Sequence, residues 1–221
     1  MRDVYHEQLD AISDSLVELT RLVGSAMSRA TQALLDADLA LAEAVIADDE
    51  RIDVINHDLE EDCFRVTALQ QPVATDLRIT MSGLRIASSL ERMGDLASHV
   101  AKQARLRYPR QSVPTELRST FAEMGSLAQT IVAKTGAVIA TKDISLAADI
   151  RRHDDEMDRL HRELFTIVLS PTWDHGVEAA IDVTLLSRYY ERYADHAVSV
   201  VRRVVHIVTG QPYSQVEVDA L

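Results

Sequence analysis

The sequence predicts an all-α protein of six long helices, arranged as two tandem, pseudo-symmetric three-helix bundles. The 221 residues include only seven glycines and five prolines, and 26% of them are charged, a composition that favours long helices. Apolar residues recur at helical spacing along most of the chain. Long segments of the first half also recur, with their turns, in the second half, which is typical of an internal repeat.

Caps and prolines place the ends of the helices. Asp38 and Asp143 stand where a side-chain oxygen would cap the start of a helix, and Gly210 stands where the last helix should end. The prolines fall between helices, as their missing N–H requires, at Pro72, Pro109, Pro114 and Pro171. The six expected helices span residues 3–36, 38–69, 74–107, 114–141, 143–169 and 176–209.

Two pairs of matching segments define the repeat. DLALAEAVIADDERID (38–53) matches DISLAADIRRHDDEMD (143–158) at an offset of 105, and LERMGDLASHV (90–100) matches YERYADHAVSV (190–200) at an offset of 100. We therefore predict a first three-helix unit over 1–108, a second over 109–210, and a flexible tail over 211–221.

Four pairs of carboxylates, each pair four residues apart, occupy matched places in the two units. They are Asp49 and Asp53, Glu91 and Asp95, Asp154 and Asp158, and Glu191 and Asp195. The first two pairs are centred on position 72 and the last two on position 174.5, both inside expected turns. Antiparallel hairpins would therefore bring each set of four acids to one level on facing helices.

Apolar stripes lead into these acids at helical spacing. Leu77, Met81 and Leu84 precede Glu91 on one face, and Val177 and Ala180 precede Glu191 in the same way. If these stripes face the core, the acids repel one another unless they are protonated, paired with bases or neutralised by metal. The alternative is that each stripe has reached a solvated end of the bundle, where acids cost little.

The side chains nearby narrow the chemistry of a metal. Eight carboxylates form a hard, oxygen-rich set that favours Mg²⁺, Mn²⁺, Fe or Ca²⁺ over a thiolate zinc site. We expect divalent or trivalent ions, with iron, manganese, magnesium and zinc as candidates. His99 and His161 are additional candidate ligands. Arg92 and Arg192 are expected to pair with acids on neighbouring helices or on a partner.

Composition excludes several classes of protein. A net charge of −12 argues against a large nucleic-acid footprint. The single cysteine, Cys63, excludes an internal disulfide and fits a reducing cytosol. The polar start lacks the apolar segment of a signal peptide, and no apolar run is long enough for direct membrane insertion. A soluble protein is expected.

The turn QPVATDLR (71–78), together with LERMGD (90–95) and YERYADH (190–196), resembles the PhoU family of bacterial phosphate-uptake regulators across essentially the whole chain. The resemblance implies a six-helix fold whose E/D-x-x-x-D motifs hold metal ions. It also implies a cytoplasmic homodimer, peripheral to the inner membrane face through protein partners, that represses the Pho regulon. Those partners would be the ATPase subunit of the phosphate ABC transporter and a sensor histidine kinase.

Other functions compete with a non-enzymatic negative regulator of phosphate uptake. One is a di-metal carboxylate oxidase or a ferritin-like metal-handling protein, because four-helix di-iron sites also use inward carboxylates. Those sites need Glu-x-x-His motifs, which this sequence lacks; Asp158 with His161 is the nearest approach. Another is a structural helical dimerisation protein without metal. No nucleophile stands beside a base in the sequence, so no catalytic residue is assigned.

Overall fold

The computed structural model describes residues 2–212 and 215, and six long helices account for most of them. Two short 3₁₀ turns, η1 (Thr115–Leu117) and η2 (Ile144–Leu146), lead into the fourth and fifth helices. The long helices are α1 (Arg2–Asp36), α2 (Leu39–Gln70), α3 (Ala74–Arg107), α4 (Arg118–Thr141), α5 (Ala147–Val168) and α6 (Gly176–Thr209). The predicted all-α class with six helices is confirmed.

The helix ends follow the predicted signals closely. The Asp38 carboxylate accepts a hydrogen bond from the backbone N–H of Leu41 at 3.0 Å, and Asp143 accepts one from Ser145 at 3.0 Å. Gly210 ends α6 at a φ of 73°, a left-handed conformation that glycine adopts without strain. The bounds of α4 and α5 differ from prediction because their first turns are 3₁₀.

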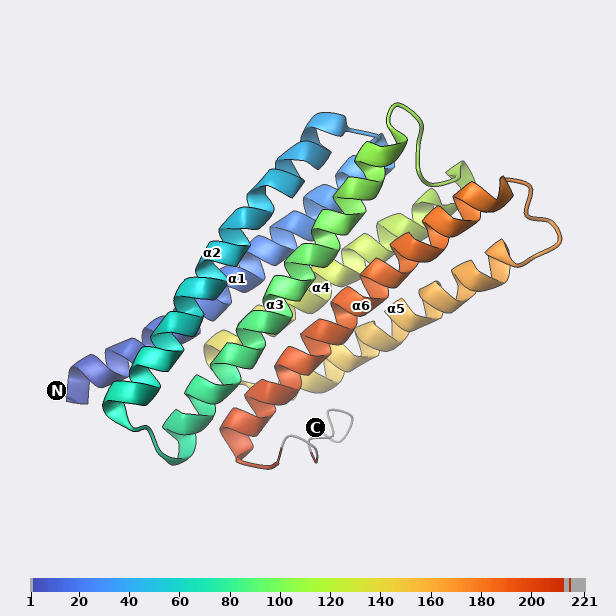
Figure 1. Ribbon diagram of the computed structural model, residues 1–221. Coiled ribbons are helices and arrows are strands. Elements are labelled where there is room, and N and C mark those ends of the chain that lie inside the picture. Colours follow the sequence, from blue (N-terminus) through green and yellow to red (C-terminus); the bar gives the residue numbers. More distant parts are fainter. Residues whose placement is uncertain (1, 213–214, 216–221) are drawn as a thin grey trace.

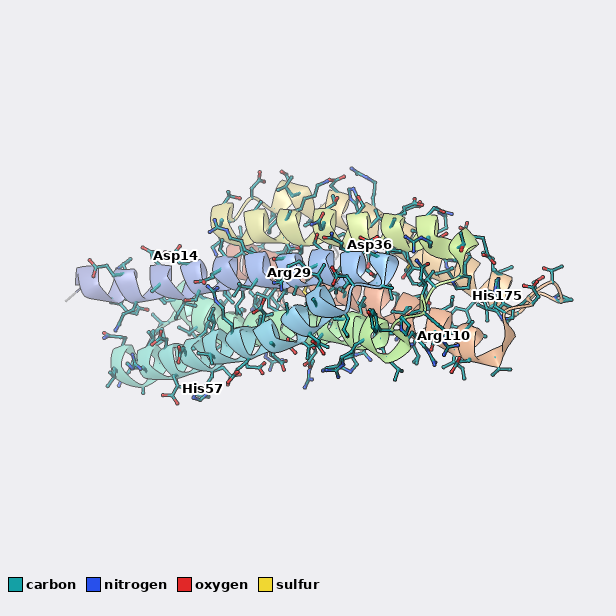
Figure 2. The ribbon with its side chains drawn as sticks, turned by 90° about the horizontal axis from the view of Figure 1, so that it is seen from above. Asp14, Arg29, Asp36, His57, Arg110 and His175 are labelled. Carbon is teal, nitrogen blue, oxygen red and sulfur yellow. The ribbon has the colours of Figure 1, made fainter. Side chains whose placement is uncertain are left out.

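Four helices lie side by side in the order α2, α3, α6, α5, with α1 and α4 behind them (Figure 1). Viewed from above, the molecule is elongated and polar side chains such as Asp14 and His57 project from its outer faces (Figure 2). Buried apolar side chains from both halves form one continuous core. Thus α1, α3, α4 and α6 form a central group, while α2 and α5 are outer helices.

The close approach of α1 and α4 depends on glycine. A Cβ added at Gly125 would lie 2.6 Å from Thr31 Cγ2, and one added at Gly136 would lie 2.7 Å from Thr20 Oγ1. The repeat offset of 105 aligns Thr20 with Gly125 and Thr31 with Gly136, and in the fold α1 supplies both threonines while α4 supplies both glycines. Thr31 Oγ1 also shares a buried hydrogen bond of 2.7 Å with the Tyr190 hydroxyl.

A buried ion pair joins α3 to α6. Arg107 donates to Asp182 through Nε at 2.6 Å and Nη2 at 2.9 Å, a two-pronged contact in which Asp182 is 4% exposed. At the other end of α3, Arg78 donates to the backbone carbonyl of Ile207 at 3.3 Å. These contacts fix α3 and α6 as antiparallel neighbours along their whole length.

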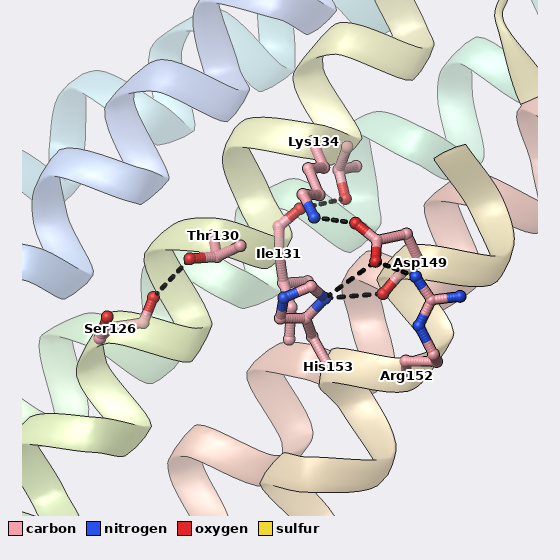
Figure 3. A network of polar contacts seen from close by, with 8 residues as sticks. Ser126, Thr130, Ile131, Lys134, Asp149, Arg152 and His153 are labelled. Atoms are coloured by element: carbon pink, nitrogen blue, oxygen red, sulfur yellow. Dashed lines mark hydrogen bonds and ion pairs between the residues drawn. The ribbon is translucent and has the colours of Figure 1, made fainter. Parts of the chain in front are cut away.

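The outer helix α5 is held to α4 near its first turn. Asp149 accepts hydrogen bonds from Lys134 on α4 and from Arg152 on its own helix (Figure 3). His153 Nδ1 lies 2.6 Å from the backbone carbonyl of Asp149 in the same network. This contact fixes the start of α5 one turn before the acids of interest.

Several predictions about organisation stay untested. The division at residue 108 is a prediction, although the two halves share one core. Most of the tail predicted to be flexible, residues 213–214 and 216–221, lies outside the described residues. No helix among the described residues has the length and apolar character that crossing a bilayer requires.

Replacing Gly125 with Ala should destabilise the fold by about 1–3 kcal/mol, because the added methyl overlaps Thr31 in a tightly packed seam. A loss of stability would point to the close contact, because Ala in a helix is otherwise more favourable than Gly by about 1 kcal/mol. Urea unfolding followed by circular dichroism measures the change. Ser126→Ala, an exposed neighbour on the same helix, serves as the control and should change stability by less than about 0.5 kcal/mol. A more stable Gly125→Ala variant would contradict the proposed close contact.

Candidate functional site

The first acid group, Asp49 and Asp53 on α2 with Glu91 and Asp95 on α3, lies on the outer surface of the α2–α3 hairpin. Gly94 lets the two helices come close here: a Cβ at this position would lie 2.9 Å from Ile52 Cδ1 and 3.2 Å from Asp49 Oδ1. Burial raises the pKa of Asp49, and the nearby charges of Asp95 and Asp53 raise it further.

The same causes act on Glu91. Burial raises its pKa first, and the negative charges of Asp95, Asp53 and Asp49 add to the increase, while Arg92 opposes it. The structure therefore brings the four carboxylates of the first acid group close enough to repel one another. The group is only partly buried, since the Asp53 residue is exposed.

The second acid group, Asp154 and Asp158 on α5 with Glu191 and Asp195 on α6, is more deeply placed. The Asp154 side chain is 2% exposed, and burial above all raises its pKa to about 7, with Asp158 and Asp195 adding repulsion. Burial likewise raises the pKa of Glu191, followed by the charge of Asp195. Carboxylates held this way favour a proton or a cation beside them.

Arginines one turn away contact three of these acids. Arg92 donates to Asp95 at 2.6 Å, Arg151 donates to Asp154 at 2.7 Å, and Arg188 donates to Glu191. The expectation that Arg92 pairs with a neighbouring helix is therefore wrong, because its guanidinium folds back onto its own helix; pairing with a partner stays a prediction. Over residues 2–212, no three His, Cys, Asp or Glu side chains are arranged to hold a metal ion.

Buried oxygens without hydrogen-bond partners remain in both groups. Asn56 Oδ1 is one of them, three residues beyond Asp53, and Asp154 Oδ1 and Glu191 Oε2 are two more in the second acid group. Leaving such an oxygen unpaired costs about 1–3 kcal/mol. The donor set is carboxylate and amide oxygen with no thiolate, which suits an oxygen-preferring cation. The donor types thus suit a bound metal, although the described side chains as they stand are not gathered to hold one.

The two candidate histidines differ in their surroundings. His99 Nδ1 lies 2.6 Å from the backbone carbonyl of Asp95, and its ring lies 5.3 Å from the Tyr189 ring on α6. His161 Nδ1 lies 2.9 Å from the Ser187 hydroxyl, and burial lowers its pKa while Asp158 opposes the decrease. His161 therefore lies beside the second acid group, whereas the His99 ring contacts the α3–α6 seam.

On α3 and α6, the stripe residues nearest the hairpin tips do not face the core. Leu77 is 39% exposed, Met81 44% and Val177 76%. The reason is that α3 and α6 bury their other faces against the central helices, and no described element covers this one. On α2 and α5, the residues that lead to the acids are buried in the core, as Val45 (2% exposed) and Ile150 (0%) show. The acids lie along their own hairpins at different depths, from the exposed Asp53 to Asp154, whose side chain is 2% exposed.

Sequence reasoning missed the arginines that contact the acids. Arg151 precedes Asp154, and Arg188 precedes Glu191, by three residues, a spacing that places side chains together on a helix. That spacing could have identified Arg151 and Arg188 from the sequence. The unpaired oxygen of Asn56 had no such signal, because it depends on what α3 places beside it.

Comparison with known proteins gives a consistent result over both halves. The family described as "PhoU domain" matches residues 16–104 and again 121–204. A Mycobacterium tuberculosis protein, "Phosphate-specific transport system accessory protein PhoU homolog 2", is 52% identical over 210 residues, covering 95% of this chain and 99% of that protein. The Mycobacterium leprae "PhoU homolog 1" is 50% identical, covering 95% of each chain.

Solved structures agree. The crystal structure of PhoU from Pseudomonas aeruginosa aligns with a TM-score of 0.82 at 29% identity, covering 94% of this chain and 100% of that one. The phosphate transport system regulatory protein PhoU from Streptococcus pneumoniae aligns with a TM-score of 0.85 at 26% identity, covering 94% and 98%.

Asp154 should make the metal-free chain less stable as the pH rises. Its folded pKa of about 7 exceeds the unfolded value of about 4, so its contribution to stability is complete below pH 4 and is lost as the pH rises to 7. In chelator-treated protein, Asp154→Asn should therefore gain about 1–3 kcal/mol relative to wild type at pH 8, and little at pH 4. Urea unfolding at both values measures this gain.

The neighbouring Asp155, whose side chain is 61% exposed, provides the control. Asp155→Asn should show no such pH-dependent gain. An equal effect of Asp154→Asn at both pH values would mean that its charge is not the source of the penalty.

Proposed function

The chain belongs to the PhoU family, and we propose that it is a regulatory accessory protein of phosphate-specific transport that represses phosphate uptake and phosphate-starvation signalling. The observation that carries this proposal is the match over the whole chain: both halves match the PhoU domain, and a relative described as a transport accessory protein is 52% identical across 95% of the chain. The residues that match the family include part of every long helix and the positions of both acid groups.

The proposed partners are the ATPase subunit of the phosphate ABC transporter and a sensor histidine kinase. The chain would act in the cytoplasm and reach the membrane through these proteins. A net charge of −12 supports docking on protein, because anionic lipid headgroups would repel it. It would act by contact and have no catalytic activity of its own. Homodimerisation stays a prediction.

Each acid group is proposed to bind metal, with iron, manganese, magnesium or zinc as candidates. In the first group Asp49, Asp53, Glu91 and Asp95 would supply oxygens. In the second, Asp154, Asp158, Glu191 and Asp195 would do so, with His161 beside them. The bound cation would offset the repulsion among the carboxylates and draw the two helices of each hairpin together. Support comes from the raised pKa values and the unpaired buried oxygens.

Replacing Glu91 and Asp95 together by Ala should lower bound metal by about half, because the second acid group stays intact. Elemental analysis of protein purified without an affinity-column metal measures the metal content. Asp10→Ala with Asp14→Ala, an exposed pair at the same spacing on α1, is the matched control and should leave the content unchanged. Equal metal content in the two variants would exclude a first-group site.

Deletion of the chain's gene from its host should raise a phosphate-starvation reporter in phosphate-rich medium to the level of starved cells. The intact chain supplied from a plasmid should restore repression. The eight-acid variant tests whether metal matters to signalling: lost repression in a folded variant is the expected result. Repression unaffected by gene deletion would reject the regulatory function itself.

A further inference from the structure

Exposed large apolar side chains gather on the α2–α3 hairpin. Phe64 is 64% exposed, Leu77 39% and Met81 44%, and these three residues are called the first patch. Cys63 and Gly83 face each other, with a Cβ at Gly83 lying 3.4 Å from Cys63 Sγ. Because α2 and α3 are antiparallel, Phe64 therefore lies level with Met81 across the hairpin.

The α5–α6 hairpin carries a second patch. It consists of Phe165, Leu169, Val177 and Ile181, which are 37%, 78%, 76% and 53% exposed. The contact of 2.9 Å between His161 and Ser187 fixes the level of the two helices, so these four side chains lie on the tip side of that contact. Contiguous exposed apolar surface of this kind is typical of interaction sites.

Three of the four residues of the second patch correspond to the three residues of the first patch under the internal repeat. Leu77 and Met81 correspond to Val177 and Ile181 at an offset of 100, and Phe64 corresponds to Leu169 at an offset of 105. The same two offsets relate the acid groups. An exposed apolar set that recurs at both hairpins is a property of the repeat and not an isolated surface residue.

Each patch adjoins an acid group on one helix face. At 100° per residue, Leu77 and Met81 share a face of α3 with Glu91 and Asp95. The distance along the axis from Leu77 to Asp95 is about 27 Å at 1.5 Å per residue. Val177 and Asp195 are separated equally on α6. Each hairpin thus offers about 27 Å of surface, apolar toward the tip and negative toward the middle.

We propose that each patch, together with its acid group, docks an amphipathic helix of a partner protein that carries an apolar row and Lys or Arg side chains at one end. A pair of antiparallel helices presents ridges and grooves that a third helix can pack against. The described residues contain no strand whose edge could bind an extended peptide. The cationic end is favoured because, while no metal is bound, the acids keep a surplus of negative charge over Arg92, Arg151 and Arg188.

A second copy of this chain fits the surface less well. A second copy of the same surface would place an apolar or an acidic end, and never a cationic one, against each acid group, and like charges that approach repel. An anionic membrane is disfavoured for the same reason. The two equivalent surfaces on one chain instead suit two helices, such as those of a dimeric partner. The inference deepens the proposed function, and rests on it only in assuming that the chain acts by contact with proteins.

The probe is a synthetic 18-residue helical peptide with Leu along one face and Lys in its last two turns. Isothermal titration with the full chain should show two peptides bound per chain, with affinity that weakens as salt rises. A peptide with Lys replaced by Glu should bind at least about tenfold more weakly. Absence of saturable binding up to about 1 mM, or equal binding of the acidic peptide, would overturn the proposal.

Two double variants and their combination locate the binding. Leu77→Ser with Met81→Ser should reduce the stoichiometry to one, Val177→Ser with Ile181→Ser should do the same, and all four together should weaken binding at least about tenfold. These side chains are exposed, so folding should be preserved. Leu106→Ser with Val208→Ser, exposed apolar residues outside both patches, is the control and should bind like wild type.

Two other occupants are outcomes of the same set of variants. Binding to phosphatidylglycerol vesicles that is lost in the patch variants would overturn the proposal in favour of a membrane. A change from dimer to monomer in sedimentation, with peptide binding unchanged, would overturn it in favour of a second copy. Neither result would affect the regulatory function, which the gene-deletion reporter tests separately.

Discussion

The seam between α1 and α4 is the contact on which the rest of the structure depends. Gly125 meets Thr31 and Gly136 meets Thr20, so that α4 gives both glycines to the crossing and α1 gives both threonines. Because α4 has no side chain at these two positions, the helices approach closely and the two units merge into one core. The central group of α1, α3, α4 and α6 is then filled, and α2 and α5 can only pack on its outside.

That arrangement explains where the acids lie and why several of them are partly or fully buried. Each acid group lies between a central helix and an outer one. The helices exclude water from some of its carboxylates, while others stay exposed to solvent. Burial raises the pKa of Asp49, Glu91, Asp154 and Glu191, and arginines one turn away offset only part of the cost. A carboxylate with a raised pKa is stabilised by a proton, by an arginine or by a bound cation. Because these three alternatives exclude one another at one oxygen, its partner should depend on pH and on the cations present.

The acids of the two units occupy equivalent positions in the repeat, but the residues around them differ. Gly94 in the first unit corresponds to Ala194 in the second, and Asn56 corresponds to His161. The second group buries Asp154 almost completely, whereas in the first the corresponding Asp49 is only partly buried. Metal affinity should therefore differ between the hairpins, although both adjoin an exposed apolar patch. Divergence of two sites on one rigid scaffold would let one protein treat two partners differently.

The sequence by itself determined the helices, their ends and the pairing of the acids. Helical spacing, the caps Asp38 and Asp143 and the prolines act locally, so one chain segment contains all the information needed. Tertiary structure alone decided which faces are covered. Leu77 and Val177 look like core residues by spacing, yet they are exposed, because burial depends on helices more distant in sequence. The unpaired oxygens of Asn56 and Glu191 depend equally on what a neighbouring helix places beside them, and no local pattern encodes that.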